Sequence, residues 1–269
     1  MSGAASPERM SPIITFASTK GGVGKTTIAY VLATELARRL ASRDGSAMPP
    51  RGRVTCIDAD PNRTLSQVLG LTDDALITCV ESDSERLLGD LRHAQSESDL
   101  VVIDLEGTAN QAMLYAAGKS DLVLVPAQPS RFDVVEAVKT IGVVRKAADL
   151  VGREIAHRVV LSRTPVLRQR VADHARAQFI RAGLPLLPVE LVQRAAFQSM
   201  TYTGTPPYRQ EGGEQAAANV ASLTDEVLTI IGMRLPQVAP PGDPRPIPEP
   251  VSARGAVPRF RVFNRPHEF

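Results

Sequence analysis

Residues 20–27 read Lys20-Gly21-Gly22-Val23-Gly24-Lys25-Thr26-Thr27, and this glycine-rich segment lies between two contrasting patterns. The apolar run Ile13–Ala17 leads into its glycines, and the helical pattern of Thr26–Ala41 follows it directly. Between a strand and a helix, glycines let backbone N–H groups converge on phosphate oxygens, and the helix start adds positive potential. The segment therefore predicts a phosphate-binding loop within an α/β domain.

The polar side chains of this loop each have an expected partner in a nucleoside triphosphate. Lys25 supplies a charge to the β- and γ-phosphates, the Thr26 hydroxyl is placed to ligate Mg²⁺, and Thr27 reaches the α-phosphate. The segment departs from the general pattern G-x-x-x-x-G-K-[ST], because Thr19 stands at the first glycine position and Lys20 adds a second lysine. We expect a nucleotide site with one additional cation.

Short apolar runs alternate with longer helical segments along the chain. Buried strands are expected at Ile13–Ala17, Val54–Ile57, Leu100–Asp104, Leu122–Val125 and Val159–Leu161, with shorter strands near Leu76–Val80 and Leu186–Val189. Helices are expected at Thr26–Ala41, Ser130–Ala148, Arg168–Ala182 and about Glu214–Arg234. This alternation predicts an α/β fold, a mostly parallel twisted sheet with helices on both faces.

Composition divides the chain into three expected regions: a flexible N-terminus (1–11), one nucleotide-binding domain (12–234) and a proline- and arginine-rich tail (235–269) that is extended or disordered. A further loop is expected at Ser42–Gly52. Cys56 and Cys79 lack metal-type spacing, and no apolar run approaches the ~20 residues that span a bilayer. We expect a cytoplasmic protein that does not use the membrane.

Acidic residues follow two of the expected strands. Val54–Ile57 runs into Asp58-Ala59-Asp60-Pro61-Asn62, and Leu100–Asp104 itself ends in an acid. The carboxyl ends of parallel strands are where α/β sheets bind ligands. Asp104 is therefore expected to hold Mg²⁺ or one of its waters. Glu106, two residues further along, has no assigned role.

Together these motifs resemble the ParA/MinD family of dimerising ATPases. The loop with its extra lysine matches the family's deviant phosphate loop, and Asp58 and Asp60 match its D-x-D-P-Q motif, with Asn62 in place of glutamine. The resemblance implies ATP and Mg²⁺ as cofactors and a homodimer bridged by ATP. It also implies that Lys20 reaches the partner subunit's phosphates, that Asp60 orients the attacking water and that Asp58 supports the Mg²⁺ site.

The resemblance weakens beyond about residue 133 but continues to about residue 210. It places Arg163 and Pro188 on the adenine side of the nucleotide. The chain is most similar to short ParA proteins, which lack an N-terminal helix-turn-helix domain, and to a relative from conjugative T-DNA transfer systems. The family's switch segment usually reads D-T-P-P or D-x-x-G, whereas Asp104-Leu105-Glu106-Gly107 keeps the glycine and adds an acid.

Charge is unevenly distributed, with a net +5 over residues 151–269 against −3 over residues 1–150. Basic side chains in a row bind nucleic acid through its phosphates, whatever the base sequence. The candidate DNA contacts around the helix expected from residue 168 are Arg168, Arg170, Arg176 and Arg181. A solvated arginine-rich surface is the alternative explanation.

The expected function is an ATP-dependent dimerising switch that binds DNA non-specifically and distributes a plasmid, chromosome or protein cluster over the nucleoid. A small centromere-binding or cargo-adaptor protein would stimulate its slow hydrolysis. Two alternatives stay open: a recruitment factor for conjugative DNA transfer, and membrane-surface positioning of the MinD kind. The helical stripe Ala217, Val220, Leu223, Val227 and Ile231 bears on the second alternative, and we expect it to pack on the sheet.

Overall fold

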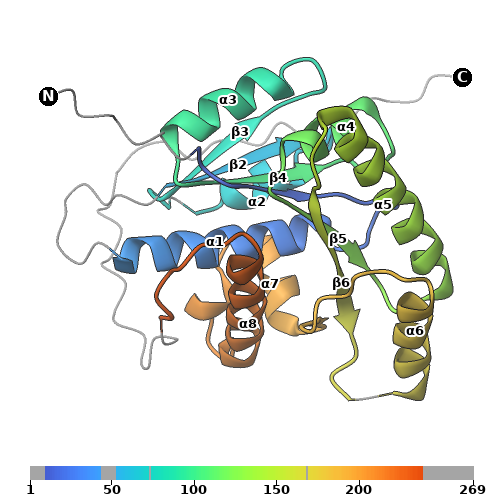
Figure 1. Ribbon diagram of the computed structural model, residues 1–269. Coiled ribbons are helices and arrows are strands. Elements are labelled where there is room, and N and C mark those ends of the chain that lie inside the picture. The colour runs from blue at the N-terminus through green and yellow to red at the C-terminus, as the bar shows by residue number, and fades with distance from the viewer. Residues whose placement is uncertain (1–9, 44–52, 73, 168, 239–269) are drawn as a thin grey trace, which may run out of the picture.

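The computed structural model describes residues 10–43, 53–72, 74–167 and 169–238 (Figure 1). Helices and strands alternate through most of this range. In chain order they are β1 (Ile13–Phe16), α1 (Lys25–Arg43), β2 (Val54–Ala59), α2 (Thr64–Leu69), β3 (Ile77–Glu81), α3 (Leu87–Glu97), β4 (Leu100–Leu105), α4 (Gln111–Lys119), β5 (Leu122–Ala127), α5 (Arg131–Val151), β6 (Ala156–Thr164), α6 (Arg170–Arg181), β7 (Leu191–Val192), α7 (Ala195–Thr203), the 3₁₀ turn η1 (Pro207–Arg209) and α8 (Glu214–Ile230).

The seven strands form one parallel sheet in the order β3-β2-β4-β1-β5-β6-β7. Strands β1, β4 and β5 are buried along their whole length, as the apolar runs predict for strands covered on both faces. Phe16 is the register partner of Asp104, and Asp104 is also the partner of Asp58. The ends of β1, β2 and β4 therefore meet at one edge of the sheet.

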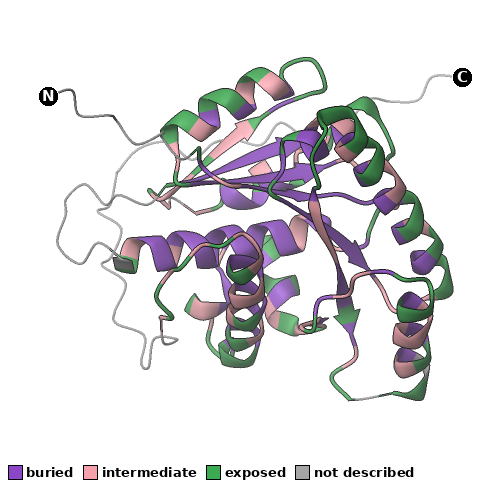
Figure 2. Ribbon diagram, in the orientation of Figure 1, coloured by how far each residue is buried: buried purple, intermediate pink, exposed green. Residues whose placement is uncertain are grey.

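Helices cover both faces of the sheet, and each face has its own apolar core (Figures 1 and 2). One core is formed by side chains of α1, α2, α7 and α8, and the other by side chains of α3, α4, α5 and α6. Figure 2 shows the central strands buried, the edge strand β3 only partly buried and the outer sides of the helices exposed. The predicted α/β fold with helices on both faces is confirmed.

One predicted strand is wrong. At Leu186–Val189 the chain forms only an isolated bridge between Leu186 and Val159, and the strand lies further along, at Leu191–Val192. Pro185 and Pro188 explain the difference, because proline has no N–H to donate to a strand ladder. The loop expected at Ser42–Gly52 begins later, since α1 continues to Arg43, and residues 44–52 lie outside the described residues.

The stripe of the last helix packs as expected. Ala217, Val220, Leu223 and Val227 are buried in the core that α8 shares with α1, and Ile231 packs against it. Among the described residues, none of the helices has the length and apolar character that crossing a membrane requires. The predicted tail is described only to residue 238, without regular structure, and residues 1–9 and 239–269 lie outside the described ranges.

Candidate nucleotide-binding site

The phosphate loop connects the end of β1 to the first residue of α1, Lys25. Gly22 and Gly24 have φ angles of 74° and 93°, a region that glycine enters without a Cβ clash. Two strand ends hold the loop in place: the Ser162 hydroxyl donates to the Val23 carbonyl at 2.6 Å, and Gln128 Nε2 donates to the Gly22 carbonyl at 3.1 Å. The predicted strand–loop–helix context is confirmed.

A cavity of about 420 Å³ lies along this loop. The loop, the segments after β2 and β4, and the end of β6 all contribute to its wall: Gly21, Gly22, Gly24, Lys25, Thr26, Thr27, Asp60, Asn62, Thr64, Glu106, Gly107, Thr108 and Arg163. Gly107 fits only as glycine, because a Cβ there would lie 2.9 Å from the Gly21 backbone nitrogen. The segment after β4 therefore packs directly on the phosphate loop.

Lys25 carries the charge at the centre of the cavity wall. Its side chain is buried, which lowers the pKa of the ammonium, and the nearby Asp104, Asp60 and Glu106 carboxylates counteract that effect in this order. A buried cation among carboxylates at a helix N-terminus is well placed to bind phosphate oxygens.

Asp58 and Asp104 are register partners on β2 and β4, and both are fully buried. Asp58 is satisfied by backbone groups: its Oδ1 accepts from the Asp60 N–H at 3.2 Å and its Oδ2 from the Ser66 N–H at 2.8 Å. Asp104 differs, because neither of its oxygens has a hydrogen-bond partner among the described residues. Burial raises the pKa of Asp104 to about 7, and the Thr26 hydroxyl and Lys25 offset this rise only in part.

These groups fit a magnesium ion. Mg²⁺ is bound by oxygen ligands, and proteins supply it with one or two carboxylates beside the phosphates of a nucleotide. The Asp104 carboxylate is buried without a partner among the described residues, and the Thr26 hydroxyl is close by. Asp58 already accepts two backbone N–H groups and fits a supporting position.

Asp60 lines the same cavity and is only half-buried. Its Oδ1 accepts from both the backbone N–H and the side-chain amide of Asn62, each at 2.9 Å. Asn62, which stands where the family has glutamine, therefore orients the carboxylate. Glu106 is anchored in a similar way, by Thr108 Oγ1 at 3.1 Å and Asn110 Nδ2 at 3.3 Å.

Lys20 does not line either cavity described here. Its ammonium lies 2.8 Å from Asp133 Oδ2, in the first turn of α5. Ser130 is the N-cap of this helix, as the S-x-x-D spacing predicts, and its hydroxyl accepts from the Asp133 N–H at 3.2 Å. The role of Lys20 across a dimer interface stays a prediction.

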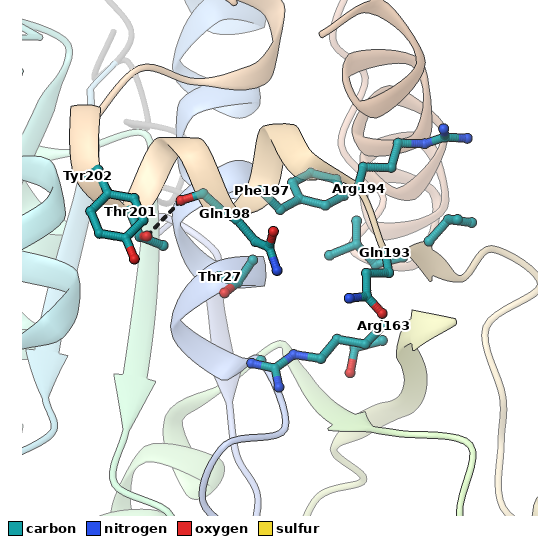
Figure 3. Close-up of a pocket in the computed structure, with 12 residues that line it drawn as sticks. Thr27, Arg163, Gln193, Arg194, Phe197, Gln198, Thr201 and Tyr202 are labelled. Atoms are coloured by element: carbon teal, nitrogen blue, oxygen red, sulfur yellow. Dashed lines mark hydrogen bonds between the residues drawn. The ribbon is translucent and has the colours of Figure 1, made fainter. Parts of the chain in front are cut away.

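A second cavity, of about 460 Å³, opens beside the first and shares Gly24, Thr27 and Arg163 with it. Figure 3 shows the side chains of Gln193 and Gln198 and the guanidinium of Arg163 pointing into the space between α7 and the start of α1. A space of this size contiguous with the phosphate cavity is suited to the base and ribose of a nucleotide.

The two residues expected on the adenine side are placed differently. Arg163 lines both cavities, and its φ angle of 51° marks a conformation that residues with a Cβ adopt rarely. Pro188 is exposed and is not among the residues that line either cavity. Its contact with the base stays a prediction.

Sequence reasoning missed the residues of α7 that form the wall of the second cavity. Phe197, Gln198, Thr201 and Tyr202 come from a helix that was not predicted, because Ala195–Thr203 is short and weakly amphipathic. The signal available was local: an arginine, two small residues and an aromatic, Arg194-Ala195-Ala196-Phe197, after a short apolar run.

The structure separates the four arginines considered for DNA. Arg170 and Arg181 are exposed at the two ends of α6. Arg176 forms ion pairs with Glu190 and, at 2.8 Å, with Asp173. Its charge is therefore compensated within the chain. Arg168 lies outside the described residues.

A family model described as "VirC1 protein" matches residues 11–218 of the chain. Among curated relatives, Protein ParA of Rhizobium radiobacter is 28% identical over 212 residues, which is 77% of this chain and 90% of that protein. Protein virC1 of the same organism is 28% identical over 199 residues, 71% of this chain and 81% of that protein.

Solved structures share the fold. An ATP complex of McdA from Cyanothece superposes with a TM-score of 0.68 at 17% identity, covering 86% of this chain and 99% of that one. The septum site-determining protein MinD of Pyrococcus horikoshii, complexed with Mg-ADP, superposes with a TM-score of 0.61 at 19% identity, covering 82% and 99%.

Proposed function

The chain belongs to the VirC1 protein family, as a ParA-like ATPase, and from this premise we propose that it is an ATP-dependent dimerising switch. ATP bridges two copies, the dimer binds DNA without sequence preference, and hydrolysis releases it. Cycling of this kind partitions or positions a plasmid, a chromosome or a protein cluster over the nucleoid. The protein would therefore act in the cytoplasm, associated with the nucleoid.

One observation carries the proposal: the buried ammonium of Lys25 lies at the start of α1 in a cavity that Thr26 and Asp60 also line, with Asp104 close by. The phosphates of ATP fit the loop and the helix N-terminus, and Lys25 contacts their β- and γ-oxygens. Relatives of the same fold have been solved with ATP and with Mg-ADP, which supports both cofactors.

The chemistry required is positioning and charge stabilisation, since phosphoryl transfer needs little covalent participation from the protein. Bound Mg²⁺ would neutralise charge on the phosphate oxygens, held by Thr26 and Asp104 with Asp58 in support. Asp60, oriented by Asn62, holds the attacking water. Lys20 of a second copy completes the charge around the transferred phosphoryl group, so a monomer hydrolyses ATP slowly.

In this proposal a small centromere-binding or cargo-adaptor protein stimulates ATP hydrolysis. Arg170 and Arg181 are exposed on α6 and are the described residues of the proposed DNA face. Arg168 belongs to the same proposed face by its place in the sequence, and the paired Arg176 contributes less.

The test is DNA binding and oligomeric state, measured with and without ATP and Mg²⁺. We expect wild type to become dimeric and to bind random-sequence duplex DNA only with ATP. Lys20→Ala should stay monomeric and leave DNA unbound while still binding ATP. A dimer that forms equally well in Lys20→Ala would contradict the role of Lys20.

The resemblance to a relative from conjugative T-DNA transfer systems gives a second candidate, a recruitment factor in conjugative DNA transfer, and the VirC1 family model matches residues 11–218. The genes next to the one that encodes this protein distinguish the two candidate functions. Neighbouring mobilisation genes support conjugative transfer, and a neighbouring gene for a small DNA-binding adaptor supports partition. For membrane-surface positioning the measurement is co-sedimentation with liposomes in the presence of ATP, which we expect to be negative because the apolar stripe of α8 is buried.

A further inference from the structure

The lysine that distinguishes this phosphate loop is bound within its own subunit. Lys20 Nζ lies 2.8 Å from Asp133 Oδ2, and the Lys20 side chain is 37% exposed whereas that of Asp133 is 2% exposed. The carboxylate therefore lies beneath the surface, and the ammonium reaches it from the loop side. Of the two partners, Lys20 is the one that is free to move toward solvent.

Asp133 does not depend on Lys20 to stay in place. Its Oδ1 accepts from the Gln128 N–H at 3.1 Å, its backbone N–H donates to Ser130 Oγ at 3.2 Å, and its Oδ2 also accepts from the Ser130 hydroxyl. A negative charge in the first turn of a helix is further favoured by the helix dipole. The carboxylate keeps these partners when Lys20 leaves.

The residue before Lys20 is tied to the same helix. The Thr19 N–H donates to Thr140 Oγ1 at 3.1 Å, and its hydroxyl donates to Glu136 Oε2 at 2.6 Å. The start of the phosphate loop is thus attached along the first turns of α5 through three side chains, of Asp133, Glu136 and Thr140. This attachment fixes the backbone from which Lys20 projects.

We propose that Asp133 is a positioning residue that holds Lys20 in its own subunit until ATP and a second copy draw it away. The inference rests on the proposed function, because it presumes that Lys20 acts across a dimer. A carboxylate at 2.8 Å neutralises much of the ammonium's charge. Transfer to a partner's phosphates therefore requires this ion pair to break first.

The Lys20–Asp133 ion pair opposes the formation of the dimer. Two copies must each release one lysine, so the cost of the ion pair enters the dimer equilibrium twice. Breaking a partly exposed ion pair of this kind lowers an equilibrium constant about threefold. Because the dimer breaks two such pairs, Asp133 raises its dissociation constant about tenfold. It limits the pairing of subunits at low ATP or low protein concentration.

The experiment compares Asp133→Asn with wild type in sedimentation equilibrium at saturating ATP and Mg²⁺. Asparagine keeps the shape and the hydrogen bond from Gln128 but removes the charge that holds Lys20. We expect the dimer to form about tenfold more tightly and basal hydrolysis at low protein concentration to rise with it. A weaker dimer in Asp133→Asn would overturn the proposal and make Asp133 a group that aims Lys20 at the partner.

Two controls separate the ion pair from other effects. Asp149→Asn removes the same charge from an exposed position at the far end of α5 and should leave the dimer constant unchanged. The double variant Lys20→Ala with Asp133→Asn should be as monomeric as Lys20→Ala alone. If wild type itself forms no dimer that depends on ATP and Lys20, the proposed function fails. If that dimer forms but Asp133→Asn does not strengthen it, only the present inference fails.

A second measurement needs no substitution. The chain has five lysines, so ¹⁵N-lysine labelling resolves the Lys20 ammonium by NMR. In nucleotide-free wild type we expect Lys20 NH₃⁺ protons protected from exchange by the Asp133 carboxylate, and a changed signal once ATP and Mg²⁺ produce the dimer. A Lys20 ammonium that exchanges as fast as the exposed lysines without nucleotide would contradict the pair.

Discussion

Asp104 is a buried carboxylic acid whose oxygens have no hydrogen-bond partner among the described residues. In an unfolded chain it would ionise near pH 4, whereas burial raises the pKa in the folded chain to about 7. Between these values the folded state binds a proton that the unfolded state has lost. The free energy of unfolding contributed by this residue therefore falls as pH rises from about 4 to about 7.

We predict that Asp104→Asn removes this pH dependence in the metal- and nucleotide-free protein. Relative to wild type, the variant should gain stability as pH rises from 5 to 8, by about 3 kcal/mol. Urea unfolding at several pH values measures it, with the exposed Asp149→Asn as control. Parallel pH profiles in the variant and wild type would contradict the prediction. Mg²⁺ with nucleotide should stabilise wild type and have little effect on Asp104→Asn.

Asp60 offers a second test at a single residue. It lines the phosphate cavity, and both hydrogen bonds that orient it come from Asn62. We predict that Asp60→Ala binds ATP, accumulates as the dimer and hydrolyses ATP about 100-fold or more slowly. Single-turnover hydrolysis and size-exclusion chromatography measure the two effects. Normal turnover in this variant would show that another group orients the water, and Glu106 in the same cavity would be the next to replace.

At the level of elements, α7 links the second cavity to α2, the helix that follows Asp60. The link is close at Gly204, the C-cap of α7, where φ is 63° and a Cβ would lie 2.6 Å from Leu71 Cβ. The Tyr30 hydroxyl on α1 also donates to the Gly204 carbonyl. Three helices therefore meet at one glycine.

Gly152 provides a matched comparison, because it is the C-cap of α5 with φ of 67° and a Cβ there would meet nothing within 4 Å. We predict that Gly152→Ala costs about 1 kcal/mol for its left-handed backbone alone. Gly204→Ala should cost that amount plus the displacement of Leu71, a total of about 3 kcal/mol. Chemical denaturation of both variants measures the free energy of unfolding. Equal losses in the two variants would show that Leu71 moves away from the new Cβ at no cost.

For the whole molecule, exposed arginines lie toward both edges of the sheet, on helices that are far apart. Arg170 and Arg181 are exposed on α6, which packs with α5 near β6, while α3 with Arg92 lies with β2 and β4 toward the other end of the sheet. Binding through phosphates makes affinity fall with salt in proportion to the number of contacts.

We predict that reversing Arg170 and Arg181 to Glu weakens ATP-dependent binding to random DNA by at least about tenfold and lowers the salt slope by about one per lost contact. Fluorescence anisotropy across a salt series measures both quantities. Arg92→Glu changes charge by the same kind of substitution on the distant α3 and should have little effect. A loss per reversed residue as large in Arg92→Glu as in the double variant would point to non-specific attraction and leave the position of the DNA face open.

The α/β fold and the phosphate loop were predictable because both depend on short, local patterns. Glycines between an apolar strand and a helix, and acids at strand ends, recur where a parallel sheet binds a nucleotide, so Lys25, Asp58, Asp60 and Asp104 could be proposed for the site from the sequence. The strand at Leu186–Val189 was wrong because two prolines outweighed a β-branched, apolar composition.

Other features required chain segments far apart in sequence to come together. Lys20 meets Asp133 only because β1 lies beside β5, which leads into α5; no local pattern links residues 113 positions apart. The pairing of Arg176 with Glu190, the wall of the second cavity and the lack of a hydrogen-bond partner for Asp104 among the described residues also depend on tertiary packing. Local sequence determines which groups the phosphate loop carries, whereas the folded sheet determines what each of them contacts within the subunit, because those contacts come from segments far apart in the chain.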